Sequence, residues 1–197
     1  NGNANDESGN GNNGVVNGAT LATDRFGNTN GSYYFNGSSW ISVLDNPQLD
    51  FQNERTISFW MKLDNFPGSE EDYIFHKQDG SGSGQKGFHA IVTPSEIKFR
   101  YKNGQNNPQY NLSAPASSFP LSQYNLVTWV VSSDSSYIYI NGLLISTGDG
   151  SNSYPFGNNS SSLYFGKTIL YSSWNLIGYL DDIVIYNRDL SNPEIQS

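Results

Sequence analysis

The amino-terminal stretch NGNANDESGNGNNG carries side-chain oxygens at close intervals between glycines. Asn3, Asn5, Asp6 and Ser8 supply amide, carboxylate and hydroxyl oxygens, and the glycines let backbone carbonyls turn inward. Calcium binds about 6–8 oxygen ligands of these kinds. The stretch lacks the spaced acidic series and terminal Glu of an EF-hand. Two interpretations remain, a cation-binding loop or a turn capped by Asp6.

A second pair of carboxylates lies in the apolar stretch GYLDDIVIYN near the carboxyl end. With the period of two that is typical of a strand, Asp181 shares a face with Ile183 and Ile185, and Asp182 lies on the other. Whichever carboxylate points inward needs compensation. No Lys or Arg lies within six residues before Asp181, and Arg188 lies beyond the strand. A cation would supply the missing charge, and backbone N–H groups are the alternative.

Signatures of catalysis are weak in this sequence. A glycosidase needs two carboxylates about 5–5.5 Å or 6.5–9.5 Å apart, and the acidic cluster 70–72 lies in a loop rich in Pro, Gly and Ser. His76 and His89 show neither metal-ligand spacing nor a nucleophile motif. A lyase that pairs Tyr73 with His76, or Tyr101 with His89, is conceivable, but the spacing does not favour it. We therefore expect a protein that is not an enzyme.

Aromatic residues beside Asn, Gln and Ser mark candidate sugar sites. A pyranose ring stacks on an aromatic face, and its hydroxyls need planar polar groups. The stretch TILYSSWNL carries Tyr171 and Trp174, and YKNGQNNPQYNLSAP carries Tyr110. Packing against neighbouring loops is the alternative for each of these rings.

Charged residues add to the candidate ligand contacts. Lys77 and Asp79 lie in the glycine-rich HKQDGSGSGQKG, which lacks the P-loop spacing and reads as a flexible hairpin loop. Arg100 alternates with Phe99 and Tyr101 along a predicted strand. An outward Arg100 on a concave sheet would favour an acidic glycan.

Composition excludes several classes of function. The net charge of −8 and a pI near 4.5 argue against a nucleic-acid partner, which needs a clustered basic surface. No stretch resembles a transmembrane span or a signal peptide, so we expect no membrane insertion. The absence of Cys favours a bacterial exported module. The missing Met indicates a piece excised from a larger secreted protein or a mature form whose leader was cut. We expect it to be secreted or at the cell surface.

Short β-prone runs separated by Gly and Asn must position these residues. SYIYINGLLIS predicts a hairpin, because a type I′ turn needs positive φ at both central residues and Asn141–Gly142 tolerates it best. RTISFWMKL alternates core and surface positions, and other runs follow at short intervals. LSNPEIQS predicts the one helix, with Ser191 and Glu194 as a capping box. This pattern predicts an all-β sandwich or jelly roll.

Three ordered stretches resemble the laminin G-like, pentraxin-like branch of the concanavalin A-like lectin/glucanase superfamily. They are NANDESGNGNNG with DRFGNTNGSYYFNGSSW, RTISFWMKL with YIFHK, and IYINGLLI with YLDDIVIYNRDLSNPEI. The resemblance covers nearly the whole chain. It implies one domain over residues 1–197, a two-sheet antiparallel β-sandwich (a concanavalin A-like jelly roll) with a short C-terminal helix.

The resemblance also bears on the carboxylates. In this superfamily the first and last strands commonly run side by side, and a structural calcium often joins them. It therefore implies one Ca²⁺ shared by Asp6 and Asp181, with Asn28, Asn36 or Asp182 as further ligands.

Members of the superfamily serve mostly as non-catalytic binding modules of secreted or surface proteins. We therefore expect a calcium-stabilised carbohydrate-binding or adhesion module. Its partners would be a polysaccharide or cell-surface glycan and the neighbouring domains of the parent protein. The alternatives are a laminin G-type protein-interaction or spacer domain and, less favoured, a glycoside hydrolase or lyase of this fold.

Overall fold

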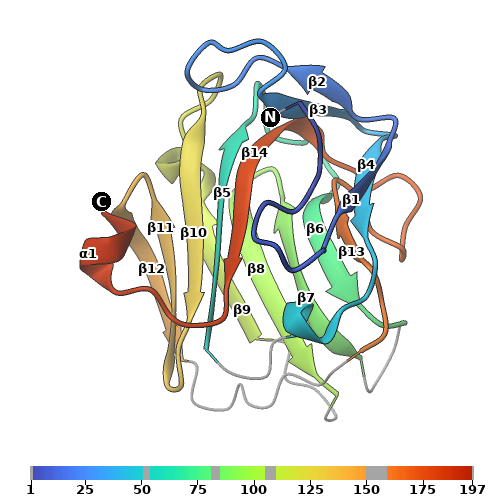
Figure 1. Cartoon of the computed structure of the whole chain (residues 1–197). Coiled ribbons are helices and arrows are strands. Elements are labelled where there is room, and N and C mark those ends of the chain that lie inside the picture. Colours follow the sequence, from blue (N-terminus) through green and yellow to red (C-terminus); the bar gives the residue numbers. More distant parts are fainter. Residues whose placement is uncertain (1, 51–53, 81–84, 105–109, 150–158, 197) are drawn as a thin grey trace.

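The computed structural model describes residues 2–50, 54–80, 85–104, 110–149 and 159–196. Two seven-stranded antiparallel sheets pack face to face (Figure 1), which confirms the predicted jelly-roll sandwich. Sheet A contains, in spatial order, β1 (Gly14–Asn17), β4 (Trp40–Val43), β13 (Leu163–Phe165), β6 (Asp72–Gln78), β7 (Lys86–Val92), β8 (Glu96–Asn103) and β9 (Tyr110–Pro115). Sheet B contains β12 (Leu143–Asp149), β11 (Ser135–Ile140), β10 (Asn125–Val131), β5 (Arg55–Lys62), β14 (Ile177–Tyr186), β3 (Ser32–Asn36) and β2 (Thr20–Ala22).

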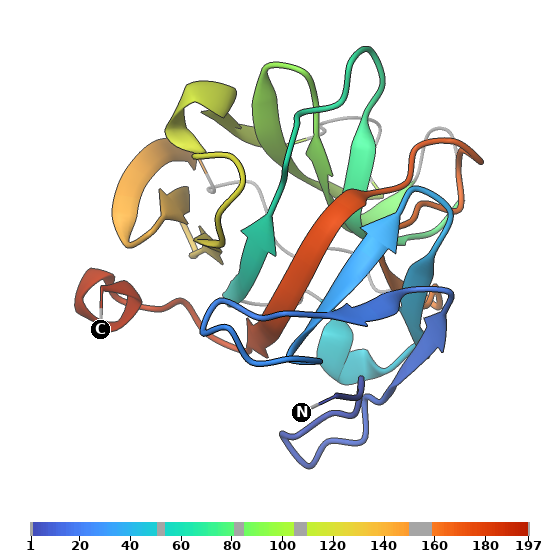
Figure 2. The ribbon, with the colours of Figure 1, turned by 90° about the horizontal axis from the view of Figure 1, so that it is seen from above.

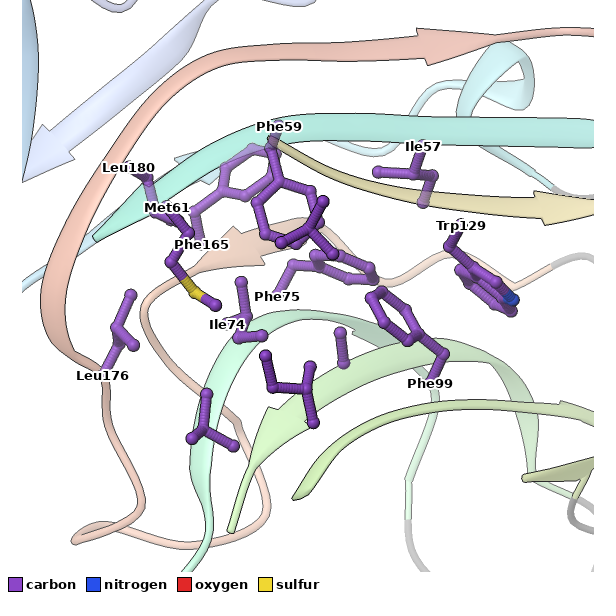
Figure 3. Packing of buried hydrophobic residues seen from close by; sticks show 14 of the residues in the cluster. Ile57, Phe59, Met61, Ile74, Phe75, Phe99, Trp129, Phe165, Leu176 and Leu180 are labelled. Atoms are coloured by element: carbon purple, nitrogen blue, oxygen red, sulfur yellow. The ribbon is translucent and has the colours of Figure 1, made fainter. Parts of the chain in front are cut away.

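The core lies between the two sheets, where side chains from both inner faces meet (Figure 3). Phe59 of β5 packs edge-to-face on Phe75 of β6, with ring centroids 5.9 Å apart. Trp129 of β10 packs on Phe99 of β8 in a tilted arrangement, with ring centroids 5.2 Å apart. Each such ring contributes about 1.5–3 kcal/mol on burial. The alternation predicted for β5 is confirmed, because Phe59 and its inward neighbours are at most 1% exposed.

The β11–β12 hairpin turns at the predicted dipeptide. Asn141 and Gly142 have φ of 52° and 75°, the positive values that a type I′ turn requires. The Asn141 side chain also accepts a hydrogen bond from the backbone N–H of Leu126 at 2.9 Å. The turn therefore fixes both its own strands and the neighbouring β10.

Strand β14 lies between β5 and β3 in the middle of sheet B (Figure 1). Its pairing with β5 shifts between Asp181 and Val184, and Asp182 has a φ of 42°. This bulge breaks the strict alternation that the sequence predicted. Leu180 and Ile183 both pack on the core as a result.

The short helix α1 (Asn192–Ile195) follows β14 and lies beside sheet B, apart from sheet A (Figure 2). The predicted capping box is confirmed, since the Ser191 backbone N–H donates to the Glu194 carboxylate at 2.8 Å. Ile195 packs on Val130 and Tyr139, so α1 covers part of the outer face of sheet B. Two 3₁₀ turns, Pro47–Leu49 and Ala116–Ser118, complete the helical elements of the described chain. No helix in these ranges is long and apolar enough to cross a membrane.

Candidate functional site

Tyr171 and Trp174, which we call the aromatic platform, lie on the loop between β13 and β14. Their rings stack with centroids 3.8 Å apart, and Tyr171 is 47% exposed. The loop is tied to β6, because Tyr73 N–H donates to the Trp174 carbonyl at 3.3 Å and Gly166 N–H donates to Ile74 at 2.8 Å. The sequence candidates Tyr171 and Trp174 therefore form one anchored surface.

Beneath the platform lies a floor of three buried rings, Tyr73, His76 and His89. Tyr73 is 6.4 Å from the Trp174 ring and 5.3 Å from His89, and the two imidazoles are 5.9 Å apart. The Nδ1 of His89 lies 2.9 Å from the Gln78 amide oxygen, whereas neither ring nitrogen of His76 has a hydrogen-bond partner among the described residues. The floor supports the platform from the sheet side.

Burial sets the charge state of this floor. It lowers the pKa of His76 to about 4 and that of His89 well below its ordinary value, because a buried imidazolium loses its hydration. Burial and the charge of Glu71 raise the pKa of Tyr73 to about 12. All three rings are therefore neutral at pH 7. Sequence reasoning did not predict that these three rings lie together beneath the platform.

A row of cations follows the outer face of β8. Phe99 and Tyr101 are buried in the core, so Lys98, Arg100 and Lys102 point outward as the alternation allowed. Arg100 lies opposite His89 in the β7–β8 ladder, which places it next to the floor. The predicted contact residue Arg100 therefore joins Tyr171 and Trp174 on one face of sheet A.

The charges in this row are unequally compensated. Lys98 pairs with Glu96 at 2.7 Å, and Arg100 lies 3.6 Å from Glu71. Lys102 donates to the Gln85 amide oxygen and has no carboxylate partner among the residues that the structure describes. Burial and the charge of Arg100 lower the pKa of Lys102. An anion on this face would relieve that repulsion.

Asp72 is the acidic group at the start of β6 whose protonation is most perturbed. Burial, helped by the charge of Glu70, raises its pKa to about 6 against an opposing backbone hydrogen bond from Ile177. A single carboxyl of raised pKa suits proton transfer but does not provide the pair that a glycosidase uses.

The remaining predicted ligand residues lie elsewhere. Lys77 belongs to β6 rather than to a loop, and its side chain is fully buried against Asp45 and Asp50, so contact with a surface ligand does not fit its placement. Asp79 accepts a hydrogen bond from the Lys86 backbone at 2.6 Å and closes the β6–β7 connection. Tyr110 begins β9, and its side chain is outside the described residues.

The residues predicted to bind calcium make other contacts. The Asp6 carboxylate accepts hydrogen bonds from Ser8 and Asn12 in its own loop, which lower its pKa. Asn28 donates to Asp24, and Asn36 accepts from Ser38. The described residues contain no group of three or more acidic or histidine side chains that could hold a metal. The calcium ion and its ligands stay a prediction.

Asp181 and Asp182 are compensated by Arg25 from the β2–β3 connection. One guanidinium nitrogen lies 2.9 Å from Asp181 and 2.7 Å from Asp182. The guanidinium carbon also lies over two aromatic rings, 4.2 Å from the Phe26 centroid and 4.7 Å from the Trp60 centroid. The charge that sequence reasoning sought near Asp181 therefore comes from a residue 156 positions away.

A hollow of about 750 Å³ opens beside this pair on the outer face of sheet B. Its lining includes Arg25, Trp60, Lys62 and Tyr124. The Lys62 ammonium lies 4.3 Å from the Tyr179 ring centroid, and the Tyr124 hydroxyl donates to the Thr23 carbonyl at 2.8 Å. The aromatic and cationic groups here hold each other in place.

Comparisons with known proteins match the observed fold. A model of the concanavalin A-like lectin/glucanases superfamily (Laminin_G_3) matches residues 35–196. No curated protein sequence matches the chain significantly. The described fold is shared by several solved structures of toxin binding domains.

Three of these structures show the likeness. The receptor binding domain of botulinum neurotoxin C/D mosaic serotype has a TM-score of 0.76 at 18% identity, over 97% of this chain and 46% of that one. The binding domain of Paraclostridial Mosquitocidal Protein 1 has a TM-score of 0.77 at 21% identity, over 98% of this chain and 48% of that one. The botulinum neurotoxin serotype D ligand binding domain in complex with N-acetylneuraminic acid has a TM-score of 0.76 at 20% identity, over 97% of this chain and 46% of that one. The chain thus spans about half the length of each, and at these identities the likeness shows the fold.

Proposed function

Because this chain belongs to the concanavalin A-like lectin/glucanase superfamily, we propose that it is a non-catalytic carbohydrate-binding module for acidic glycans. The observation that carries this proposal is the outer face of sheet A, where the aromatic platform, the neutral floor and the cations of β8 lie next to one another. One solved structure of similar fold holds N-acetylneuraminic acid, itself an acidic sugar, which supports the ligand class.

Each part of the face has a distinct task in this proposal. Tyr171 and Trp174 offer a ring surface to the C–H face of a pyranose. Arg100 and Lys102 attract a carboxylate, and the bidentate fork of Arg100 fixes its direction. Tyr73 and the two histidines are positioning residues, since they are buried, Tyr73 contacts Trp174, and both imidazoles contact Tyr73.

Glycan binding is tested with an array of acidic and neutral glycans. We expect the wild type to bind acidic glycans and Trp174→Ala to bind at least about 10-fold more weakly, the equivalent of about 1.4 kcal/mol. The melting temperature of the variant checks that it is folded. An array without hits contradicts the proposal and favours the laminin G-type protein-interaction or spacer domain.

The absence of catalysis is a separate part of the proposal. The raised pKa of Asp72 is the one observation that favours a glycoside hydrolase or lyase. Incubation with mixed polysaccharides followed by a reducing-end assay tests it. We expect no release of reducing ends, and release that is abolished in Asp72→Asn would contradict the non-catalytic assignment.

We also propose secretion or surface display by a bacterium and stabilisation by calcium. Support comes from the oxygen-rich opening loop and from the low content of charged residues, 14%. Adding Ca²⁺ to chelated protein should raise the melting temperature by a few degrees, because a ligand that binds only the native state stabilises it. The rise should be smaller in Asp6→Ala. An unchanged melting temperature in the wild type would remove calcium from the proposal.

A further inference from the structure

Lys77 is enclosed by acceptors deep beside β6. Its side chain is 0% exposed, and its Nζ lies 2.7 Å from Oδ1 of Asp45 and 2.9 Å from Oδ1 of Asp50. The ammonium also donates to the carbonyls of Ser161, at 3.1 Å, and Asn159, at 3.3 Å. These contacts hold the nitrogen in one position against two carboxyl groups.

The Lys77 ammonium and the Asp50 carboxylate form a buried ion pair. One ammonium faces two carboxylates, and the Asp50 side chain is only 6% exposed. The Oδ1 of Asp50 is buried without a hydrogen bond, so its contact with Lys77 is an ion pair that lacks hydrogen-bond geometry. Taking charges out of water is costly, and Coulomb attraction repays it only when the remaining lone pairs are satisfied. Asp50 therefore has an unsatisfied oxygen beside a fixed amine.

We propose that Lys77 and Asp50 condense into an intramolecular isopeptide bond, with Asp45 as the proton carrier. Asp45 accepts a proton from the Lys77 ammonium, and the neutral nitrogen attacks Cγ of Asp50. The new N–C bond forms, a C–O bond of the carboxyl breaks, and the oxygen leaves as water with the two protons that the nitrogen has lost. Asp45 ends as the carboxylate that it was. The step needs no oxidant, reductant or cofactor.

The fold favours this condensation in two ways. Well-oriented groups within one molecule react with an effective molarity of about 10⁵–10⁸ M. This offsets the tendency of an amide bond in bulk water to hydrolyse. The product also removes the Lys77 and Asp50 charges from a site of low dielectric, and a neutral amide costs less to bury than an ion pair with an unsatisfied oxygen. The bond would close the chain covalently between β6 and the segment that follows β4.

The mass of the intact, denatured wild-type protein tests the proposal directly. We expect it to be lighter than the sequence mass by one water molecule. Trypsin should leave Lys77 uncut and release peptide 26–55 joined to peptide 63–86, because Lys and Arg end both segments. Fragmentation of the joined pair locates the acceptor. The full sequence mass after prolonged incubation, or a bond to Asp45, would overturn the assignment.

Variants separate the roles of the three side chains. Lys77→Met should keep its full mass and yield no joined peptides. The matched variant Lys62→Met on β5 should lose one water molecule and yield joined peptides, as the wild type does. Asp45→Asn should slow the appearance of the joined pair at least 10-fold in freshly folded protein. Equal rates in Asp45→Asn and the wild type would contradict the role of Asp45. If Lys77→Met does not fold, the wild-type mass still decides the question.

Discussion

The outer faces of the two sheets both carry cations against aromatic rings, but the cations meet different partners. On sheet B the Arg25 guanidinium contacts two carboxylates and lies over two rings. On sheet A the partners of Arg100 and Lys102 are a carboxylate at 3.6 Å and a neutral amide. The positive charge of Arg25 is neutralised by carboxylates of the protein itself. The positive charges on sheet A are only partly neutralised, which leaves them able to attract an anionic ligand.

Residue composition alone does not mark a binding face. Both faces have a Trp, a Tyr and basic residues, and the sheet B hollow of about 750 Å³ is roomy enough for a sugar ring. The difference lies in how the charges are paired. Variants that unpair the charges on one face or neutralise those on the other therefore test whether charge pairing distinguishes the two faces.

The largest effect is expected from removing Arg25. Arg25→Met leaves Asp181 and Asp182 facing each other without a cation, and Asp181 is 8% exposed. Loss of one partner from a buried ion pair costs about 3–5 kcal/mol, and exposure of Asp182 brings our expectation to about 3 kcal/mol. Urea unfolding measures it. Arg188→Met, at an exposed pair with Glu194, is the matched control and should lose far less. Equal losses of unfolding free energy in Arg25→Met and Arg188→Met would contradict a stabilising role for the buried Arg25 ion pair.

Acid should weaken the fold through the sheet A floor. The pKa of His76 is lowered from 6.5 to about 4, so the unfolded chain takes up a proton before the folded one does. The stabilising contribution is complete above about pH 6.5 and is lost as the pH falls toward 4, up to about 3 kcal/mol. Chemical unfolding from pH 7 to 4 should therefore show a shallower decline in His76→Phe than in the wild type. Parallel curves would contradict the burial of a neutral His76.

Asp72 supplies the opposite control in the same pH range. Its pKa is raised from 3.8 to about 6, so its folded form holds a proton more tightly than the unfolded chain does. The contribution of Asp72 to stability is present below pH 3.8 and is lost as the pH rises through 6. Asp72→Asn should therefore make the decline on acidification steeper than in the wild type, by about 1–2 kcal/mol after solvent screening is allowed for.

The smallest effect separates the two faces by ligand affinity. Lys102→Gln should weaken binding of an acidic glycan about 3–10-fold, because one charge near the surface is worth about 1 kcal/mol and is screened by salt. Lys62→Gln, on the other face, should bind as the wild type does. A loss in Lys62→Gln alone would move the proposed site to sheet B. Titrations at two salt concentrations measure both variants.

Local sequence patterns were sufficient for most of the fold. The Asn141–Gly142 hairpin and the inward row of β5 follow from turn chemistry and alternation within a few residues. Lys77 shows where such reasoning fails. A bulge between Tyr73 and Phe75 shifts the register of β6, which turns His76 outward and Lys77 inward. Strict alternation counted from the buried Ile74 would place His76 inward and Lys77 outward, the reverse of what the structure shows.

The candidate site was predictable only in part. Tyr171, Trp174 and Arg100 were found because aromatic and basic residues beside polar ones are visible in the sequence, but nothing local shows that they share a face. Arg25 was missed because its partner Asp181 is 156 positions away. Pairing of charges across that separation depends on tertiary structure.

The place of β14 in sheet B has a consequence for biosynthesis. Strand β14 pairs with β3 on one side and with β5 on the other, so β3 and β5 do not pair with each other. Before residues 177–186 leave the ribosome, a nascent chain holds two open strand edges, and unpaired edges template association with other chains. Contacts between such distant segments also slow folding. A translational pause just before the codons for β14 would therefore prolong the interval in which these two strand edges stay unpaired.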